Sequence, residues 1–479
     1  MLTDPEALRL LGLAPRERLL SGLSRPRPSA AERREAGRAL RGTLPRSALG
    51  KLALPDPRPD PVAMIEAENA TRVASLVPLR NARMVASPFA FLRGTAGVMA
   101  SDLSAMPRTG IDVMAGGDMH LANFGLFASA ERHLIFAIND FDEVHPGPWE
   151  WDLKRLAASA AVVADFLGGG RAEGERAARA AALAYAGSMR RLSEMGFLEV
   201  WYDLIGAQDI LAALPPELEK PARRLIDRAR RRGHLRSLDK LSEEVDGQWR
   251  IAEDPPLVVR ETALPDGTPL PEAMEGLFAA YLVSLPEASK RTLGRYRLVD
   301  VARKVVGVGS VGTSCWVGLF VGADGGDPLF LQVKEAGPSV LARYVAHPYA
   351  GNEGRRVVMG QRMIQGSPDI FLGWGPSDPA APRHFYVRQL ADMKGGVRFL
   401  AGDRGMLRKL PDYAALCGRA LALAHAKSGD PAMISGYCGR GEALADALAA
   451  FALAYAERAE RDHAAFAVAV RSGRVPVEG

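Results

Sequence analysis

Residues 116–125 read GGDMHLANFG and residues 135–144 read IFAINDFDEV, and these two stretches carry the most specific pattern in the chain. Asp118 and Asn123 lie five positions apart on one polar loop, and Asp140 directly follows an apolar run that is typical of a strand. Phosphoryl transfer from a nucleotide needs a carboxylate to orient the attacking hydroxyl, together with oxygen ligands that hold magnesium against the phosphates. The pattern therefore predicts Asp118 as the catalytic base, and Asn123 and Asp140 as magnesium ligands.

Other polar residues near these stretches have less specific roles. Asp142 is predicted as a further metal ligand, while His120 either contacts the substrate or stabilises the loop through a hydrogen bond. Asp152 begins a helix in PWEWDLKRLAAS, where an acid stabilises the amide dipoles, and is predicted to hold the loop in place. A purely structural polar loop is the alternative, because Asp and Asn side chains often stabilise turns. Four acidic or amide side chains around one strand end favour the catalytic interpretation.

A second pattern follows much later in the chain. Gly307, Gly309 and Gly312 form G-x-G-x-x-G, but β-like residues (SCWVGLFV) follow them, which argues against the strand–glycine–helix order of a dinucleotide fold. We predict a hairpin whose glycine loop lies over nucleotide phosphates. Lys334, at the end of the apolar run FLQV, is predicted to contact the phosphates, with Glu353 as its ion-pair partner. Considered alone, Lys334 would be interpreted as a solvated lysine on an edge strand. In combination with the glycines and Glu353, it is interpreted as part of a nucleotide-binding site.

These motifs resemble those of the protein-kinase-like superfamily, in particular its aminoglycoside and choline kinase branch. GDMHLAN resembles the H-G-D-x-H-x-x-N loop of that branch, INDFDE its I-D-[WF]-[DE] strand end, and LQVKEA its lysine strand. The chain is more closely similar to a bacterial family, the domain of unknown function 2252, over stretches that run from GRALRGTLPRSA to VGVGSVGTSCW. The resemblance implies a phosphotransferase that uses ATP and magnesium and acts on a small-molecule hydroxyl acceptor.

The order of the motifs is unusual for that superfamily. In kinases the glycine loop and the lysine precede the catalytic loop, whereas here the catalytic loop comes first. The C-terminal stretch LCGRALALAHAKSGD resembles the helix that normally precedes the loop. The expected fold is therefore α+β, two-lobed, protein-kinase-like and circularly permuted, with a mostly helical C-lobe and a small β-rich nucleotide lobe. Residues 414–425 should then pack beside residues 117–123.

The chain is expected to divide into five segments. They are an Arg/Pro-rich arm with a helix (1–79), the first part of the helical lobe with the catalytic loop (80–245), a connector (246–300), the β-rich nucleotide-binding lobe (301–400) and the second part of the helical lobe (401–479). Apolar periodicity predicts helices at 30–41, 61–76, 151–167, 172–195, 220–236, 352–365, 413–425 and 442–470, and strands at 113–115, 133–138 and 384–390.

The composition is that of a globular protein that buries a sizeable core, because 48% of the 479 residues are hydrophobic and 24% are charged. The net charge of +5 is compatible with a nucleotide ligand and does not predict a nucleic-acid partner. Three distant cysteines predict neither a disulfide framework nor a metal site. No signal peptide or membrane span is expected, which predicts a cytoplasmic protein with no membrane partner.

Three other functions stay open on the residues alone. A metal-dependent phosphoesterase would use Asp118, His120, Asp140 and His145 as metal ligands, but the downstream histidine motifs of that class are missing. The other two are nucleotide binding without catalysis, and nucleotidyl transfer on the same fold. The acceptor pocket is expected to involve residues 60–110 and 172–245, with Arg83 and Arg93 as candidate contacts to an anionic group of the substrate, or else as structural ion pairs.

Overall fold

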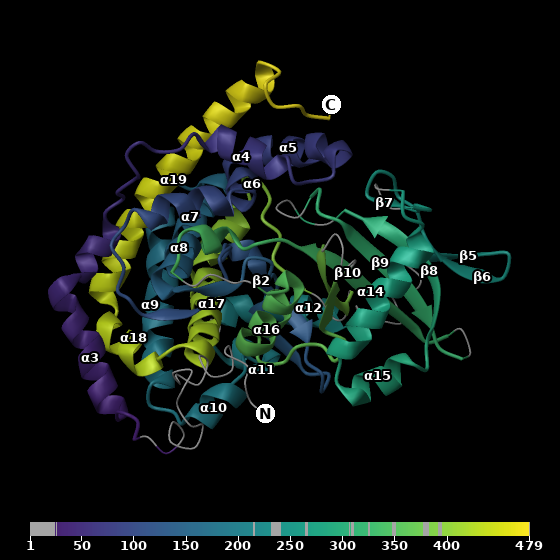
Figure 1. Ribbon diagram of the computed structural model, residues 1–479. Coiled ribbons are helices and arrows are strands. Elements are labelled where there is room, and N and C mark those ends of the chain that lie inside the picture. The colour runs from purple at the N-terminus through teal and green to yellow at the C-terminus, as the bar shows by residue number, and fades with distance from the viewer. Residues whose placement is uncertain are drawn as a thin grey trace.

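The structure is a computed structural model, and it describes residues 24, 26–213, 216–230, 241–263, 267–305, 307, 311–323, 326–346, 351–376, 383–390 and 395–478. Its fold is α+β: a large helical part lies beside a smaller part built around a six-stranded sheet (Figure 1). The helical part joins the N-terminal half of the chain to its C-terminal helices, and the sheet comes from the sequence between them.

Four long helices form the centre of the helical part: α8 (Trp149–Phe166), α9 (Arg171–Leu192), α17 (Arg404–Ser428) and α19 (Glu442–Arg471). Their buried faces are rich in alanine, so that the backbones approach closely. A Cβ atom at Gly418 of α17 would overlap the carbonyl oxygen of Ala181 in α9. The helices predicted at 151–167, 172–195, 413–425 and 442–470 are thus present, with ends that differ by up to nine residues.

Shorter helices surround these four. They are α3 (Ala30–Thr43), α4 (Pro61–Asn69), α5 (Val77–Val85), α6 (Pro88–Arg93), α7 (Ala96–Ser104), α10 (Phe197–Tyr202), α11 (Ala207–Ala213), α12 (Pro216–Arg230) and α18 (Pro431–Cys438), with the 3-10 turns η1 (Arg46–Gly50), η2 (Ala74–Leu76) and η3 (Leu121–Asn123). The helix predicted over 61–76 ends early, at Asn69, because the Thr71 hydroxyl donates to the carbonyl of Glu68 and closes the last turn. Residues 231–236 of the predicted basic helix lie outside the described residues.

The sheet is antiparallel and has the strand order β11-β12-β10-β9-β8-β7. The strands are β7 (Val258–Val259), β8 (Arg297–Lys304), β9 (Cys315–Val321), β10 (Pro328–Ala336), β11 (Gly373–Pro376) and β12 (His384–Gln389). The predicted glycine loop joins β8 to β9, and a second hairpin joins β9 to β10. Helix α16 (Glu353–Ile364) follows β10 and η4 (Val340–Arg343), and lies between the sheet and the helical part (Figure 1).

Residues 246–300, for which the sequence predicts only connecting pieces, instead complete the sheet part. They contain α14 (Leu270–Ser284), α15 (Glu287–Leu293), β7 and the start of β8, and β6 (Gln248–Ile251) pairs with β5 (Ser242–Val245). Leu277 and Tyr281 of α14 pack into one hydrophobic core with Phe320 and Leu331 of the sheet. The frequent prolines of this segment mask the apolar face of α14 in the sequence.

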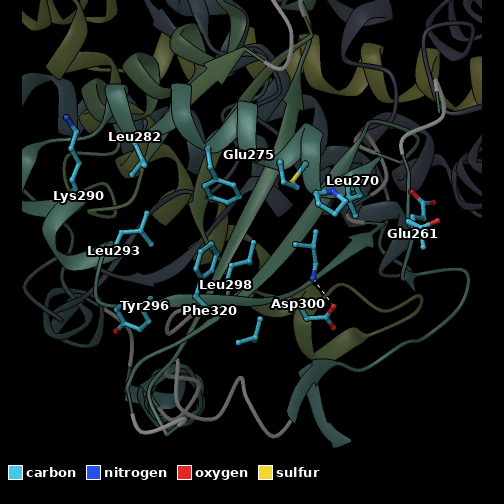
Figure 2. Close-up of a pocket in the computed structure, with 17 residues that line it drawn as sticks. Glu261, Leu270, Glu275, Leu282, Lys290, Leu293, Tyr296, Leu298, Asp300 and Phe320 are labelled. Atoms are coloured by element: carbon cyan, nitrogen blue, oxygen red, sulfur yellow. Dashed lines mark hydrogen bonds between the residues drawn. The ribbon is translucent and has the colours of Figure 1, made fainter. Parts of the chain in front are cut away.

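A groove of about 950 Å³ runs between α14, α15 and the sheet. Figure 2 shows its apolar floor, with Leu298 and Phe320 near the middle, and charged groups at its two ends, Lys290 at one and Glu261 at the other. The carboxylates predicted to be catalytic do not line this groove. We therefore locate the candidate site elsewhere, in the cavity described below.

Two small hairpins position the predicted catalytic residues. β1 (Asp112–Ala115) pairs with β4 (His145–Pro148), and β2 (Phe124–Ala128) pairs with β3 (Leu134–Ile138). In the second hairpin Phe124 lies opposite Ile138, and the Asn139 amide donates to the carbonyl of Asn123 at 2.8 Å. The residue before β2 thus meets the residues after β3, which brings Asn123 and Asp140 to the same end of the hairpin. None of the described helices is both long enough and apolar enough to cross a membrane.

Lys154 of α8 gives the core a measurable pH dependence. Its ammonium lies 3.2 Å from the Met106 sulfur and 4.8 Å from the centre of the Phe451 ring, and burial lowers the pKa of Lys154 from 10.5 to about 8. Between these two pH values the unfolded chain binds more protons than the folded one, so the contribution of Lys154 to stability rises with pH. Lys154→Met is expected to remove that rise and to increase the free energy of unfolding at pH 7 by up to about 3 kcal/mol. Urea denaturation at pH 7 and pH 10 measures both effects.

The exposed residue Lys51 provides the control, because Lys51→Met should leave the pH dependence of stability unchanged. A Lys154→Met variant that is less stable than wild type at pH 7 would contradict the prediction. It would indicate that the charge of Lys154 gains more from Glu150 than it loses by burial.

Candidate active site

The predicted catalytic loop lines a cavity of about 450 Å³. Its walls come from the loop itself, from the N-terminal helices α4 to α7, and from the glycine loop and the segment after β10. Of the predicted site residues, the cavity is lined by Asp118, His120, Asn123, Asp140, Asp142, Gly307 and Arg93. Gly312, Lys334, Glu353 and Arg83 lie around it without lining it, and Gly309 lies outside the described residues.

The backbone of the catalytic loop is held by Asp152, as the sequence predicts. Its carboxylate accepts hydrogen bonds from the amides of Gly116 and Gly117, at 2.6 and 2.9 Å, and lies 3.1 Å from Nε2 of His425. Gly117 has a φ of +77°, and a Cβ atom there would meet the carbonyl oxygen of Glu143 at 2.6 Å. Glycine is therefore required at this position by both backbone conformation and space.

Asp118 is partly buried and is held by Arg155 of α8. The Arg155 Nε donates to Oδ1 of Asp118 at 2.6 Å, and the same guanidinium donates to the carbonyl of Leu92 at 2.8 Å. Burial alone would raise the pKa of Asp118, but Arg155, and then His120, lower it below its ordinary value. Asp118 is thus a carboxylate at neutral pH. A group of this kind orients a hydroxyl well and is a weak proton acceptor, which suits the loose transition state of phosphoryl transfer.

His120 and Asn123 flank Asp118 in the cavity wall. The Asn123 side-chain amide donates to the Asp118 carbonyl at 2.7 Å, and His120 Nε2 lies 3.6 Å from Asp118 Oδ2. Burial lowers the pKa of His120 to about 3, so that its ring is neutral at physiological pH. Its buried Nδ1 has no hydrogen-bond partner among the described residues. His120 therefore keeps one ring nitrogen free for a ligand.

Lys334 is buried in β10 and pairs with Asp142, not with Glu353. Its ammonium donates to Oδ2 of Asp142, while the Tyr386 hydroxyl donates to Oδ1 at 2.7 Å. The Lys334 side chain is only 2% exposed, which excludes the solvated edge-strand lysine. Despite burial, Asp142 raises the pKa of Lys334, and the pKa of Asp142 is correspondingly lowered. Asp142 thus joins the catalytic strand end to the sheet.

The predicted ion pair of Lys334 with Glu353 is wrong, because another cation occupies Glu353. The guanidinium of Arg356, one turn further along α16, donates to the Glu353 carboxylate. Arg356 also donates to the carbonyls of Asp142 and Gly337, at 2.9 and 2.8 Å, and to that of Val144. Helix α16 is therefore attached to the strand end through Arg356.

The glycine loop contacts the N-terminal helices directly. The Val73 amide donates to the Gly312 carbonyl at 2.7 Å, and Arg72 donates to the Val311 carbonyl at 2.7 Å. Arg83, a candidate substrate contact, instead donates to the Gly307 carbonyl at 2.5 Å. The loop thus lies over the same cavity as Asp118.

Helix α17 packs beside the predicted catalytic loop. The sequence predicts that residues 414–425, which belong to this helix, lie beside residues 117–123 of the loop. The hydroxyl of Tyr413, at the edge of that segment, donates to the carbonyls of Leu121 and Phe124, at 3.1 and 3.2 Å. His425 reaches Asp152 through Nε2, and its Nδ1 lies 2.8 Å from the hydroxyl of Tyr185.

Comparison with known families gives one match. The profile described as "Uncharacterized protein conserved in bacteria (DUF2252)" matches residues 72–469, which is most of the chain. The chain belongs to the DUF2252 family. No curated protein and no solved structure is significantly similar to it. The matched region begins at Arg72 and so includes every wall of the cavity except that from α4.

The site of this DUF2252 protein contains oxygen donors that could contribute to a magnesium ion. Burial and the neighbouring Asp142 raise the pKa of Asp140, and a bound cation would offset both effects. Among the described residues, no three His, Cys, Asp or Glu side chains could hold a metal ion by themselves. Magnesium commonly binds through one or two carboxylates, with phosphate oxygens and waters completing its shell. Asp140 and the Asn123 amide oxygen would hold such an ion.

Three residues that hold this DUF2252 site in place were not predicted: Arg155, Arg356 and Tyr386. Arg155 was detectable, because it lies three residues after Asp152 and so shares the helix face that meets the loop. Arg356 and Tyr386 carry no such local signal. His145, a proposed phosphoesterase ligand, is fully buried in β4 and does not line the cavity.

Proposed function

We propose that this chain transfers the γ-phosphoryl group of magnesium-bound ATP to a hydroxyl acceptor. The observation that carries the proposal is the convergence of two sequence patterns, almost 200 residues apart, on one cavity. Asp118, Asn123 and Asp140 line it from the helical part, and the glycine loop lies over it from the sheet. A polar loop with a purely structural role does not account for the second pattern.

Each group has a role in this reaction. Asp118 orients the attacking hydroxyl, and Asn123 and Asp140 hold magnesium against the phosphates. The glycine loop covers the phosphates. Lys334 does not line the cavity and acts on the site through Asp142, which lines it and accepts from the Lys334 ammonium. Magnesium, when bound, neutralises the charge that develops on the phosphoryl oxygens.

The arrangement of elements supports a permuted kinase-like fold. In kinases a glycine-loop hairpin is followed by a strand that carries the lysine and then by a helix. The hairpin β8–β9, strand β10 with Lys334, and helix α16 follow the same order. The contacts of Tyr413 and His425 around the catalytic loop support the expectation that α17 replaces the helix that precedes this loop in other kinases.

A thermal unfolding titration with ATP and magnesium tests the proposal. Wild type is expected to gain about 2.7 kcal/mol of stability when the nucleotide is at a hundredfold excess over its dissociation constant. Asp140→Asn should lose the magnesium-dependent part of this gain. Asp165→Asn is the control, because Asp165 is an exposed carboxylate of α8 that does not line the cavity.

Two results would contradict the proposal. In the first, no nucleotide stabilises the wild-type protein, whereas manganese or zinc alone stabilises it. This result would favour the metal-dependent phosphoesterase. The other is transfer of label from α-labelled but not from γ-labelled ATP, which would indicate nucleotidyl transfer.

A further inference from the structure

The wall of the cavity that comes from the N-terminal helices is rich in arginine. Arg72, Arg80 and Arg93 all line it, on the segments that precede the catalytic loop. A guanidinium offers five N–H donors in a fixed fork and matches carboxylate or phosphate oxygens. The question is therefore which of these guanidinium groups the protein already satisfies.

Arg80 is engaged through both of its terminal nitrogens and has a structural role, although its buried Nε has no partner among the described residues. It is completely buried and donates to Asn69 at 2.8 Å, to Glu68 at 3.2 Å and to the carbonyl of Gly94 at 2.9 Å. Arg72 is engaged in part, because it donates to the glycine loop while its buried Nε has no partner among the described residues.

Arg93 differs from both. Within the part of the chain that the structure describes, it makes no hydrogen bond and no ion pair within 4 Å, and its Nε is buried without a partner. Its guanidinium lies 5.8 Å from the centre of the Phe89 ring, and Phe89 packs edge-on against His120. Burial lowers the pKa of Arg93, and the nearby charges of Asp118 and Asp140 oppose this only in part. A guanidinium that is largely removed from water without a partner is costly, unless a ligand supplies the anion.

The place of Arg93 separates it from the sheet groups assigned to the nucleotide, although Arg93 lies near the predicted magnesium ligand Asp140. Lys334 and the glycine loop belong to the sheet, whereas Arg93 packs through Phe89 on the side of Asp118 and His120. This is the side from which a hydroxyl acceptor would approach. His120, whose Nδ1 is also buried and has no partner among the described residues, lines the same cavity.

We propose that Arg93 binds an anionic group, a phosphate or a carboxylate, of the acceptor, so that the substrate of this site is a hydroxyl compound that carries negative charge. This inference rests on the proposed phosphotransferase function. Arg72, which touches the glycine loop, borders the anion site on the side of the nucleotide.

The test is a binding titration with inorganic phosphate, and in parallel with acetate, in the absence of nucleotide and metal. Wild type is expected to bind at least one of the two anions, and Arg93→Gln to bind it at least about tenfold more weakly. Arg93→Lys should retain part of the affinity. Arg171→Gln is the control, since Arg171 is an exposed residue of α9 that does not line the cavity, and it should bind the anion like wild type. Because Arg93 makes no hydrogen bond, its variants are expected to fold.

A second titration, with magnesium and ATP, distinguishes the acceptor from the donor as the source of the anion. Unchanged ATP affinity in Arg93→Gln supports the acceptor site, and a parallel loss of ATP and phosphate binding overturns it in favour of the donor phosphates. No binding of either anion to wild type also overturns it. The wild type could instead bind the anion through Arg93 but bind no ATP. This result would support the proposed anion site and contradict the proposed phosphotransferase function.

Discussion

Asp118→Asn is expected to lower the rate of ATP turnover by about 10²–10⁴-fold, the usual contribution of a positioned acid or base. The amide keeps the shape of the side chain but loses the negative charge that orients a hydroxyl for attack. Until the acceptor is identified, water can serve in its place. The measurement is therefore the release of labelled phosphate from γ-labelled ATP in the presence of magnesium.

Folding and binding need separate readouts in this variant, because Asp118 also pairs with Arg155 at 2.6 Å. Asparagine retains an oxygen for that guanidinium, so stabilisation by magnesium and ATP should persist. Asp165→Asn should turn over ATP like wild type. Normal turnover in a folded Asp118→Asn variant would exclude Asp118 as the catalytic base.

Lys334→Met is expected to lower the free energy of unfolding by about 3–5 kcal/mol, since the loss of one partner from a buried ion pair leaves the other charge uncompensated. The stranded charge is that of Asp142, which would lose the Lys334 ammonium and retain the Tyr386 hydroxyl at 2.7 Å. Urea denaturation measures the loss. Binding of ATP with magnesium should weaken in the same variant.

A double-mutant cycle identifies the partner of Lys334. Lys334→Met combined with Asp142→Asn should be less destabilising than the sum of the single changes, by about 0.5–3 kcal/mol. Lys334→Met combined with Glu353→Gln should be additive within about 0.5 kcal/mol. Coupling to Glu353 instead would restore the ion pair that the sequence predicts.

Most of the catalytic strand end could be predicted from the sequence because its signals are local. The apolar run before Asp140 predicts β3, and the spacing of Asp118 and Asn123 places both on one loop. Asp152 was assigned to the support of that loop from its place in the first turn of a helix, and it holds the amides of Gly116 and Gly117. The helix α14 was missed, because prolines on both sides hide its apolar face.

By itself, the sequence determined the local elements around the site, the residues of the catalytic loop and the membership of the DUF2252 family, because each depends on neighbouring residues or on a linear pattern. Only the tertiary structure decided the ionic partners. Lys334 and Asp142 are 192 positions apart, and Glu353 is bound by an arginine of its own helix. The structure also separated Arg83, which is bound to the glycine loop, from Arg93, which makes no hydrogen bond among the described residues. The physical reason is that the pairing of buried charges depends on distance, burial and competition among all nearby groups, none of which sequence spacing specifies.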